Sequence, residues 1–225
     1  MKNASEESPK VGFPAESVKV RHSRKPPPVL FSNEEIPMSV LTPAEILSVL
    51  ESAPERELTP EPLALSEGTE APQVLLFSDG GASPNPGPGG WAFILRSAAP
   101  DSEGRLLEVE GAGAVAETTN NRMELTAVIR GLLHLQRSCR ILLVSDSQYV
   151  LKGLSEWLPG WKRKNWINSK RKPVLNSDLW KILDHLSTQH QITCQWTRGH
   201  AGHAENERCD HLVGQIRAEH FGGLG

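Results

Sequence analysis

Residues 74–79, Val-Leu-Leu-Phe-Ser-Asp, and residues 141–146, Ile-Leu-Leu-Val-Ser-Asp, share one pattern, an apolar run that ends in Ser-Asp. A short, continuous apolar run is typical of a strand that is buried on both faces of a sheet. Apolar residues at helical spacing lie between the two runs, over about 121–137, and a helix there supplies the crossover that parallel neighbours require. The sequence therefore predicts two parallel strands that lie side by side and end at the same edge of a sheet.

The remaining elements follow from periodicity and from the turn residues. The segment 80–90, Gly-Gly-Ala-Ser-Pro-Asn-Pro-Gly-Pro-Gly-Gly, is so rich in Gly and Pro that we expect a loop. Strands are expected at 74–77, 91–96, 106–113, 141–144 and 192–197, and further helices at about 147–158 and around the apolar stripes of 179–186 and 209–216. The fold class is therefore α/β: a five-stranded mixed sheet, with three antiparallel strands followed by two parallel additions, flanked by helices.

The composition excludes several classes of protein. The chain has 225 residues and 24 Lys and Arg against 27 Asp and Glu, which suits one domain with an extension, or two small domains. No apolar run approaches the roughly 20 residues that span a bilayer, so no membrane association is expected. Three widely spaced cysteines cannot form a disulfide framework and indicate a reducing compartment. The first residues lack the apolar core of a signal peptide and are too acidic for a transit peptide, so we expect a cytoplasmic location.

A boundary near residue 72 divides the chain into two unlike parts. Residues 1–72 contain 11 of the 17 prolines, none of the six Trp, and 12 acidic against 7 basic side chains. We expect this acidic extension to be mostly disordered, because it cannot bury enough apolar surface to offset chain entropy. A capping box at 42–45, Thr-Pro-Ala-Glu, and the apolar stripe after it predict a short helix over 43–53, either transient or docked on the core or on a partner. Residues 73–225 are expected to form the folded domain.

Four acidic residues are expected to converge at one edge of the sheet. Asp79 and Asp146 end neighbouring strands, whose axes lie about 4.8 Å apart, at the edge where open α/β sheets bind ligands. Glu124 and Asp210 each flank the apolar stripe of a helix instead of facing water. Taken singly, each is ordinarily a charge at a strand end or a helix start, but four unpaired carboxylates together would repel and raise one another's pKa values. A hard divalent cation removes that repulsion, and all-oxygen ligands favour Mg²⁺ or Mn²⁺.

Four segments resemble the motifs of type 1 ribonuclease H in their order and spacing. They are SDGGASPNPGPGG (78–90), TTNNRMEL (118–125), SDSQYV (145–150) and GHAGHAENERCD (199–210), and the resemblance spans about residues 73–220. It implies a ribonuclease H-like form of the sheet described above, in residues 73–225, and an endonuclease that hydrolyses the RNA strand of RNA–DNA hybrids to leave 5′-phosphate and 3′-hydroxyl ends. In that family two Mg²⁺ ions flank the scissile phosphate. The resemblance thus implies that Asp79, Glu124, Asp146 and Asp210 are catalytic metal ligands for two Mg²⁺ ions, with Mn²⁺ able to substitute.

The resemblance also assigns a role to the loop 199–203, Gly-His-Ala-Gly-His. His200 matches the family's mobile catalytic histidine, which is thought to aid proton transfer or product release, and an imidazole suits that task near neutral pH. An isolated loop histidine is ordinarily no more than solvent-exposed, so the surrounding motif is what favours catalysis. His203 is expected to be structural.

A set of polar residues matches family positions that touch the hybrid. Amides accept from a 2′-hydroxyl and donate to base edges in the shallow minor groove, which distinguishes RNA from DNA. The same residue types also serve in turns and as helix caps, and for Asn176 and the asparagines at the start of the 121–137 helix both interpretations stay open. The resemblance implies hybrid contacts from Asn85, Asn120, Asn121 and Gln148, and a phosphate pocket for the DNA strand from Thr119 and Asn176.

Residues 157–173 interleave tryptophans with basic side chains. Six basic residues and no acidic residue lie between 162 and 172, which resembles the basic protrusion of bacterial and eukaryotic members of the family. Lys and Arg would neutralise phosphates while the rings stiffen the segment, although a run of charge alone is usually a solvated face. The expected hybrid-binding residues are Trp157, Trp161, Lys162, Arg163, Lys164, Trp166, Lys170, Arg171 and Lys172.

Two other functions stay open on the sequence. One is a non-catalytic nucleic-acid-binding module on the same fold, which would lack a carboxylate or the histidine; all five residues are present. The other is a different enzyme of the superfamily, such as an integrase-like strand-transfer domain or a reverse-transcriptase fragment, which the complete 199–210 motif disfavours. The extension lacks the aromatic residues and Lys clusters of the hybrid-binding domain that eukaryotic members carry, so its partner is unassigned. We expect a monomer that binds RNA–DNA hybrids.

Overall fold

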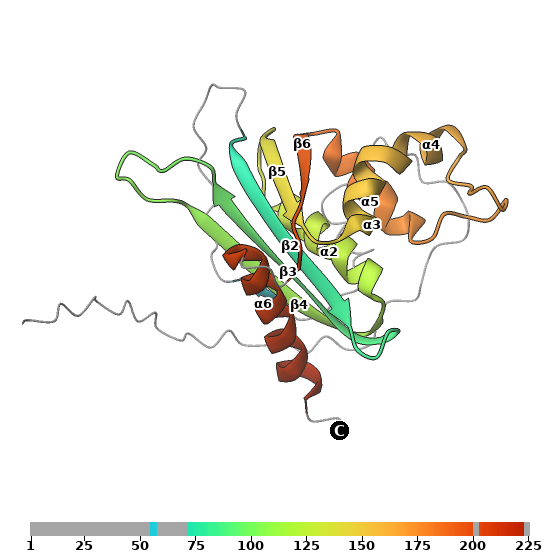
Figure 1. Ribbon diagram of the computed structural model, residues 1–225, viewed down its shortest axis with the longest axis horizontal. Coiled ribbons are helices and arrows are strands. Elements are labelled where there is room, and N and C mark those ends of the chain that lie inside the picture. Colours follow the sequence, from blue (N-terminus) through green and yellow to red (C-terminus); the bar gives the residue numbers. More distant parts are fainter. Residues whose placement is uncertain (1–54, 58–71, 200–202, 223–225) are drawn as a thin grey trace, which may run out of the picture. The chain divides into compact units, whose positions relative to one another are not determined.

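The strands of the described residues form one mixed sheet. This computed structural model describes residues 55–57, 72–199 and 203–222. The chain divides into two units, Met1–Glu35 and Ile36–Gly225, and all of the described residues belong to the second. Within them the strands are β1 (Glu55–Glu57), β2 (Val74–Ala82), β3 (Gly87–Ser97), β4 (Glu108–Thr118), β5 (Arg140–Ser145) and β6 (Gln191–Trp196). They form a six-stranded sheet in the order β1-β4-β3-β2-β5-β6, of which Figure 1 labels the five longer strands.

The predicted topology of the five longer strands is confirmed. β2 pairs antiparallel with β3, and β3 with β4, which gives a meander. β2 then pairs in parallel with β5, and β5 with β6. In the β2–β5 pair Phe77 lies opposite Val144, so the Ser-Asp sequences that follow these two residues lie at the same level along the strands.

Strand β1 differs from what the composition of the extension predicts. Its three residues, Glu-Arg-Glu, pair antiparallel with Gly111–Gly113 of β4. Three charged residues carry no apolar alternation, so the sequence gives no sign that their backbone adds to a sheet. The helix predicted over 43–53 lies outside the described residues.

The expectation of a loop over 80–90 is wrong. β2 continues to Ala82 and β3 begins at Gly87, so only 83–86 connect them, and both proline peptide bonds in this turn are cis. The glycines of the segment serve close packing: a Cβ atom on Gly80 would lie 2.3 Å from the carbonyl carbon of Met123, and one on Gly89 would lie 2.4 Å from Cγ2 of Thr118. Neighbouring backbone and side chains come so near at these two strand positions that only glycine fits.

The helices begin near their predicted positions, but two predicted ranges need correction. α2 (Asn120–Leu133) ends before the expected limit of 137, whereas α5 (Ser177–Ser187) and α6 (Ala204–Phe221) cover the predicted stripes. The single helix expected at 147–158 is instead α3 (Gln148–Lys152), a π-helical turn (Gly153–Trp157) and α4 (Leu158–Arg163). The irregular turn passes directly against Trp180, since a Cβ atom on Gly153 would lie 1.8 Å from the indole ring.

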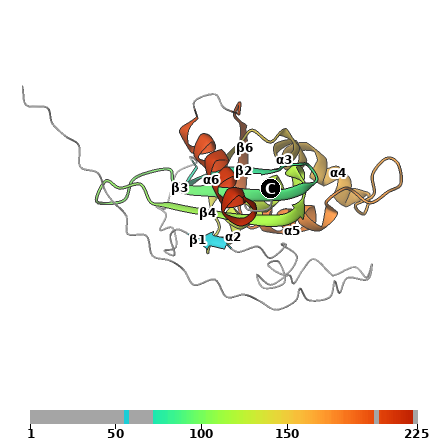
Figure 2. The same cartoon turned by 90° about the horizontal axis from the view of Figure 1, so that it is seen from below.

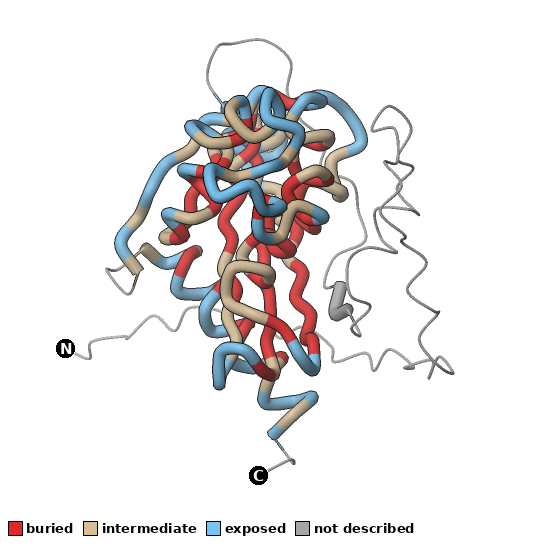
Figure 3. The backbone as a smooth tube through the Cα atoms, turned by 90° about the vertical axis from the view of Figure 1, so that its right-hand side faces the viewer, coloured by how far each residue is buried: buried red, intermediate tan, exposed pale blue. Residues whose placement is uncertain are grey.

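Helices cover both faces of the sheet, with α6 on one side and α2 and α5 on the other (Figure 2). The α2 and α5 side buries a core that includes Leu76, Phe93 and Trp180. On the other side, α6 packs over Phe77 and Ile94. Successive residues of β2 therefore belong to different cores, as predicted for a strand buried on both faces, and Figure 3 shows the buried residues following the strands. Among the described residues, no helix is both long and apolar enough to cross a membrane.

Gly80→Ala is predicted to destabilise the fold. The added methyl group would meet the backbone of Met123 and Glu124, which cannot rotate away, so overpacking should lower the free energy of unfolding by about 1–3 kcal/mol. Gly214→Ala is the matched control, because nothing lies within 4 Å of a Cβ atom there and alanine favours a helix by roughly 0.5–1 kcal/mol. Urea unfolding should shift the two midpoints in opposite directions, and an unchanged Gly80→Ala midpoint would contradict the close packing.

Candidate active site

Asp79 and Asp146 lie at the same edge of the sheet, each two residues after the Phe77–Val144 pair that ends the β2–β5 ladder. Asp79 still belongs to β2, and its Oδ1 accepts a hydrogen bond from the Gly80 N–H at 2.8 Å. Asp146 follows β5, and a Cβ atom on Gly199 would lie 2.6 Å from its Oδ2. The backbone that follows β6 therefore lies directly against this second carboxylate.

Glu124 is brought to Asp79 by the packing of α2 on β2. A Cβ atom on Gly80, the residue after Asp79, would lie 2.5 Å from the backbone nitrogen of Glu124. The Glu124 side chain is held by Ser147, whose Oγ donates to Oε2 at 2.6 Å. The same Oγ accepts from the Val150 N–H at 3.2 Å and caps α3. One hydroxyl group thus ties the carboxylate on α2 to the helix that follows β5, a link that the sequence did not predict.

Asp210 reaches the same place from the other face of the sheet. It lies on α6, and together with Asp79 and Asp146 it lines a hollow of about 280 Å³. Four separate elements therefore deliver the four predicted carboxylates to one region.

The mutual repulsion of these groups acts on the pKa of Asp79. This pKa is raised from 3.8 to about 6, chiefly by burial and next by the charge of Asp146. Asp210 and Glu124 raise it further by smaller amounts, and the hydrogen bond from Gly80 lowers it. Burial also raises the pKa of Glu124; the Ser147 hydrogen bond opposes this rise, and Asp146 adds to it. The other three carboxylates therefore all act electrostatically on Asp79.

The donor set fits a hard divalent cation in charge and in ligand type. All four side chains offer carboxylate oxygens, which Mg²⁺ and Mn²⁺ prefer, and the side chains that act on the Asp79 pKa are all anionic. Within the described part of the chain, however, no three His, Cys, Asp or Glu side chains are arranged so that they could hold a metal ion. Asp79, Asp146 and Asp210 line a common hollow, Glu124 is not part of its lining, and the four do not form a closed cage. His200, the fifth expected catalytic residue, lies outside the described residues.

Comparison with known proteins gives the family. A family model described as RNase H matches residues 71–217. The chain is 55% identical over 142 residues to the Ribonuclease H of Halorhodospira halophila, covering 63% of this chain and 91% of that protein. It is 48% identical over 170 residues to the Ribonuclease H of Pelobacter propionicus, covering 76% and 97% of the two chains. The chain belongs to the ribonuclease H family. The resemblance in the four motifs is thereby confirmed, and the family is one of nucleases.

Solved structures agree with this assignment. LC9-RNase H1, described as a type 1 RNase H with the type 2 active-site motif, is 28% identical, with a TM-score of 0.60 over 68% of this chain and 75% of that one. The N-terminal RNase H domain of a Mycobacterium tuberculosis protein, at 23% identity and a TM-score of 0.52, covers 69% of this chain and 100% of its own. The ribonuclease H-like fold predicted from the sequence is confirmed.

The asparagines expected to contact a hybrid connect β2 to α2. The Asn120 side-chain oxygen accepts from the Ala82 N–H at 2.7 Å, and its backbone N–H donates to Oδ1 of Asn85 at 3.3 Å. Neither Asn120 nor Asn121 caps α2, because the cap is Thr119, whose Oγ1 accepts from the Arg122 N–H at 3.4 Å. The capping interpretation of the two asparagines is therefore wrong. Gln148 is the first residue of α3 and is exposed.

Thr119 and Asn176 occupy the N-cap positions of two helices whose first turns are joined. The guanidinium of Arg122 on α2 pairs with Asp178 on α5, with NH2 and Oδ2 3.0 Å apart. Asn176 has a φ of 56° and makes no capping hydrogen bond with its side chain; its Nδ2 donates to the Tyr149 hydroxyl at 3.2 Å. Asn176 therefore stands at the N-cap position of α5 but does not cap the helix through its side chain.

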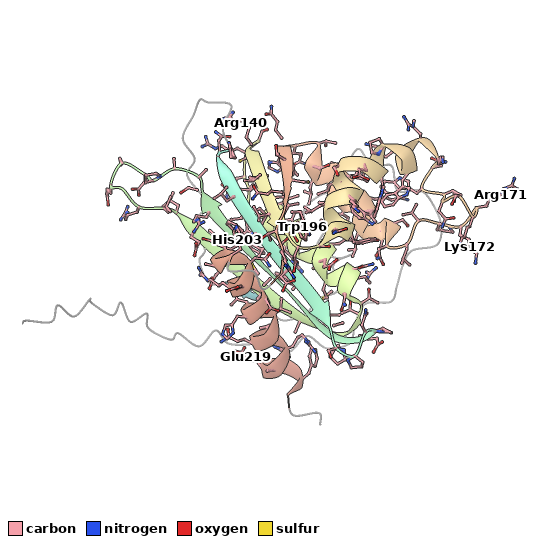
Figure 4. All side chains as sticks on the ribbon, viewed as in Figure 1. Arg140, Arg171, Lys172, Trp196, His203 and Glu219 are labelled. Carbon is pink, nitrogen blue, oxygen red and sulfur yellow. The ribbon has the colours of Figure 1, made fainter. Side chains whose placement is uncertain are left out.

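The tryptophans of the basic protrusion pack together and against the domain. The ring centroid of Trp161 lies 5.6 Å from that of Trp157, 6.5 Å from that of Trp166 and 5.3 Å from that of Trp180. They fix the base of the protrusion. Lys162 forms an ion pair with Asp184 at 2.9 Å. The other five predicted basic residues, which are Arg163, Lys164, Lys170, Arg171 and Lys172, are exposed, and Figure 4 shows the last two at the far tip.

The residues of the hollow that were missed from the sequence include two polar side chains of α6. Asn206 and Arg217 line the hollow, and Asn206 is 3% exposed, with an Oδ1 that has no hydrogen-bond partner among the described residues. Both lie on α6, one about a turn before Asp210 and the other about two turns after it. Helical periodicity of 3.6 residues per turn could have identified them once Asp210 had been assigned.

Removing the Asp79 carboxylate is predicted to stabilise the metal-free protein above pH 6. Because its pKa is about 6 in the folded protein against an ordinary value of 3.8, the folded state binds this proton more tightly than the unfolded chain does. The charged Asp79 therefore does not destabilise the fold below pH 3.8, its ordinary pKa. The destabilisation grows as the pH rises from 3.8 to about 6, the pKa in the folded protein, and is complete above about pH 6. Urea unfolding in chelator should make Asp79→Asn more stable than the parent at pH 8, on the order of 2–3 kcal/mol, with no difference below about pH 4. A difference independent of pH would contradict the repulsion.

Proposed function

We propose that this protein is an endonuclease that hydrolyses the RNA strand of RNA–DNA hybrids. The observation that carries the proposal is that Asp79, Asp146 and Asp210 line one hollow of a ribonuclease H domain, and that Glu124 of α2 acts on the same Asp79 carboxylate. The curated relatives are named Ribonuclease H and are matched over nearly their whole length, which supports the same activity here.

The metal-dependent part of the proposal rests on the acidic donor set. Asp79, Glu124, Asp146 and Asp210 would hold two divalent cations, Mg²⁺ with Mn²⁺ as a substitute. When bound, the cations would activate a water molecule and stabilise the leaving 3′-oxygen, which leaves 5′-phosphate and 3′-hydroxyl ends. Ser147 holds Glu124 in orientation through its 2.6 Å hydrogen bond, and Gly80 lets the backbone of α2 approach Asp79. We assign proton transfer or product release to His200.

Selection of the hybrid is assigned to the polar residues around the carboxylates. Asn85, Asn120, Asn121 and Gln148 would distinguish RNA through its 2′-hydroxyl groups, and the hydrogen bonds of Asn120 to the end of β2 and to the 83–86 turn hold the first two in place. Thr119 and Asn176 would bind a phosphate of the DNA strand at the joined starts of α2 and α5. The exposed basic residues of the protrusion, on the scaffold of its tryptophans, would bind phosphates further along the duplex.

Residues 73–225 are the catalytic domain in this proposal, and residues 1–72 are an extension with a separate role. The family match at 71–217 supports that boundary. We further expect a monomeric enzyme that acts in the cytoplasm; a partner for the extension is left unassigned.

The activity is tested by cleavage of an end-labelled RNA–DNA hybrid in Mg²⁺, with double-stranded DNA and double-stranded RNA as controls. We expect the RNA strand alone to be cut, and no cleavage in excess chelator. Asp146→Asn should lower kcat by roughly three orders of magnitude, since loss of a metal ligand removes several kcal/mol of transition-state stabilisation, and should leave hybrid affinity nearly unchanged. An intact hybrid across metals and pH would refute the activity and favour a binding module.

The protrusion is tested by the salt dependence of hybrid binding. Replacing Lys170, Arg171 and Lys172 with Gln should weaken binding and flatten the plot of log affinity against log salt by roughly one unit for each phosphate that these side chains neutralise in the parent. Arg105→Gln is the control, because Arg105 is also exposed but lies in the β3–β4 hairpin, where it pairs with Asp101 and Glu103. Equal slopes for the triple variant and the parent would exclude the protrusion from hybrid binding.

A further inference from the structure

The hollow that contains the carboxylates continues along α6 and has a basic residue at its other end. Asp210 and Arg217 both line it. Residues seven apart on an α-helix lie on nearly the same face, separated by roughly 10.5 Å along the axis, so the two side chains reach the hollow at different points. Glu207 also lines it, about one turn before Asp210 and therefore on the acidic side. The hollow is thus polarised, with carboxylates toward the start of α6 and a guanidinium toward its end.

Arg217 is held in place by the turn between β2 and β3. Its NH2 donates to the Ser83 carbonyl oxygen at 3.1 Å. Its aliphatic stem crosses β3 at Gly90, where a Cβ atom would lie 3.0 Å from Cγ of Arg217. The Nε is buried without a hydrogen-bond partner among the described residues. A guanidinium offers several N–H donors in a planar fork, so the single contact with Ser83 leaves donors for a ligand in the hollow.

Asp210 and Arg217 lie about two turns apart along α6 and both line the hollow. A ligand that uses both ends must therefore be long enough to span them and must carry a negative charge at the guanidinium end.

We propose that Arg217 binds the RNA strand at a phosphate neighbouring the one that is cut. This inference rests on the proposed function, in which the scissile phosphate lies at the carboxylates. A nucleic acid strand carries further phosphates along the same path, and a guanidinium pairs with a phosphate through two parallel hydrogen bonds. Because the same side chain holds the Ser83 carbonyl, the 83–86 turn that carries Asn85 is fixed next to the bound strand.

The test uses hybrids in which one RNA phosphate is replaced by an uncharged methylphosphonate, moved one linkage at a time through the five linkages on either side of the cut. Affinity is measured by fluorescence anisotropy in chelator, where nothing is cleaved. The parent should lose about tenfold in affinity when the linkage at Arg217 is neutralised. Arg217→Gln should bind the unmodified hybrid about tenfold more weakly than the parent does. Neutralising the linkage at Arg217 should not lower the affinity of this variant any further, whereas neutralising any other linkage should change its affinity as it changes that of the parent.

Two further variants make the outcome decisive. Arg217→Lys keeps the charge and the length of the side chain without the planar fork, so it should bind with intermediate affinity and lose affinity at the same linkage as the parent. Arg105→Gln, which removes an exposed arginine of the β3–β4 hairpin, should behave as the parent at every linkage. If Arg217→Gln is sensitive to every linkage that affects the parent, Arg217 acts only through the Ser83 turn and the inference is overturned. Cleavage of the unmodified hybrid by the parent in Mg²⁺ tests the proposed function separately, so the two failures are distinguishable.

Discussion

Close packing of one helix against each face of the β2–β3 pair is the constraint on which the site depends. On one face, α2 lies so near β2 that Gly80 has no room for a Cβ atom. On the other face, α6 lies on β3 at Gly90, where a Cβ atom would be 3.2 Å from the carbonyl oxygen of Val213. Two parallel strands alone supply only Asp79 and Asp146. The helices that these glycines admit add Glu124 from one side and Asp210 from the other, so four carboxylates come together just beyond the end of the β2–β5 ladder.

The same packing places the carboxylates in surroundings that disfavour their charged form. Burial and like charge raise the pKa of Asp79 to about 6, so a folded protein at neutral pH holds an anion that its surroundings disfavour. Carboxyl groups whose pKa is raised by burial and like charge are enriched at functional sites, and such sites cost stability. The two buried cores offset this penalty, because β2 contributes side chains to both of them. Ser147 relieves part of the repulsion by donating to Glu124, and a divalent cation would relieve the rest.

Much of the fold could be predicted, because apolar runs and helical stripes report burial directly. The parallel pair was evident from two runs that end in Ser-Asp, and the meander from its short connections. The errors arose where a residue type has two physical uses. Glycine favours turns, but it also permits neighbouring backbone and side chains to pack closely against a strand. Glycines of the segment 80–90 serve this packing, so β2 and β3 extend into a segment that composition alone assigns to a loop. Strand β1 is made by backbone pairing of three charged residues, which leaves no periodic signal.

The site was predictable to the extent that charge and periodicity locate it, and no further. The four carboxylates could be found because, in the sequence, each follows an apolar run or flanks an apolar stripe, although β2 continues past Asp79 to Ala82. The roles of the asparagines at the start of α2 could not, since only the three-dimensional structure shows that Thr119 accepts the capping hydrogen bond and leaves Asn120 to join β2 to α2. Arg217 escaped notice because a single arginine on a helix is usually a solvated charge; its meaning comes from the hollow it shares with Asp210. A metal-binding cluster alone would attract any anion that can bind its cations. A fixed guanidinium at a second point on the same helix favours instead a ligand with regularly spaced negative charges. A nucleic acid strand is such a ligand.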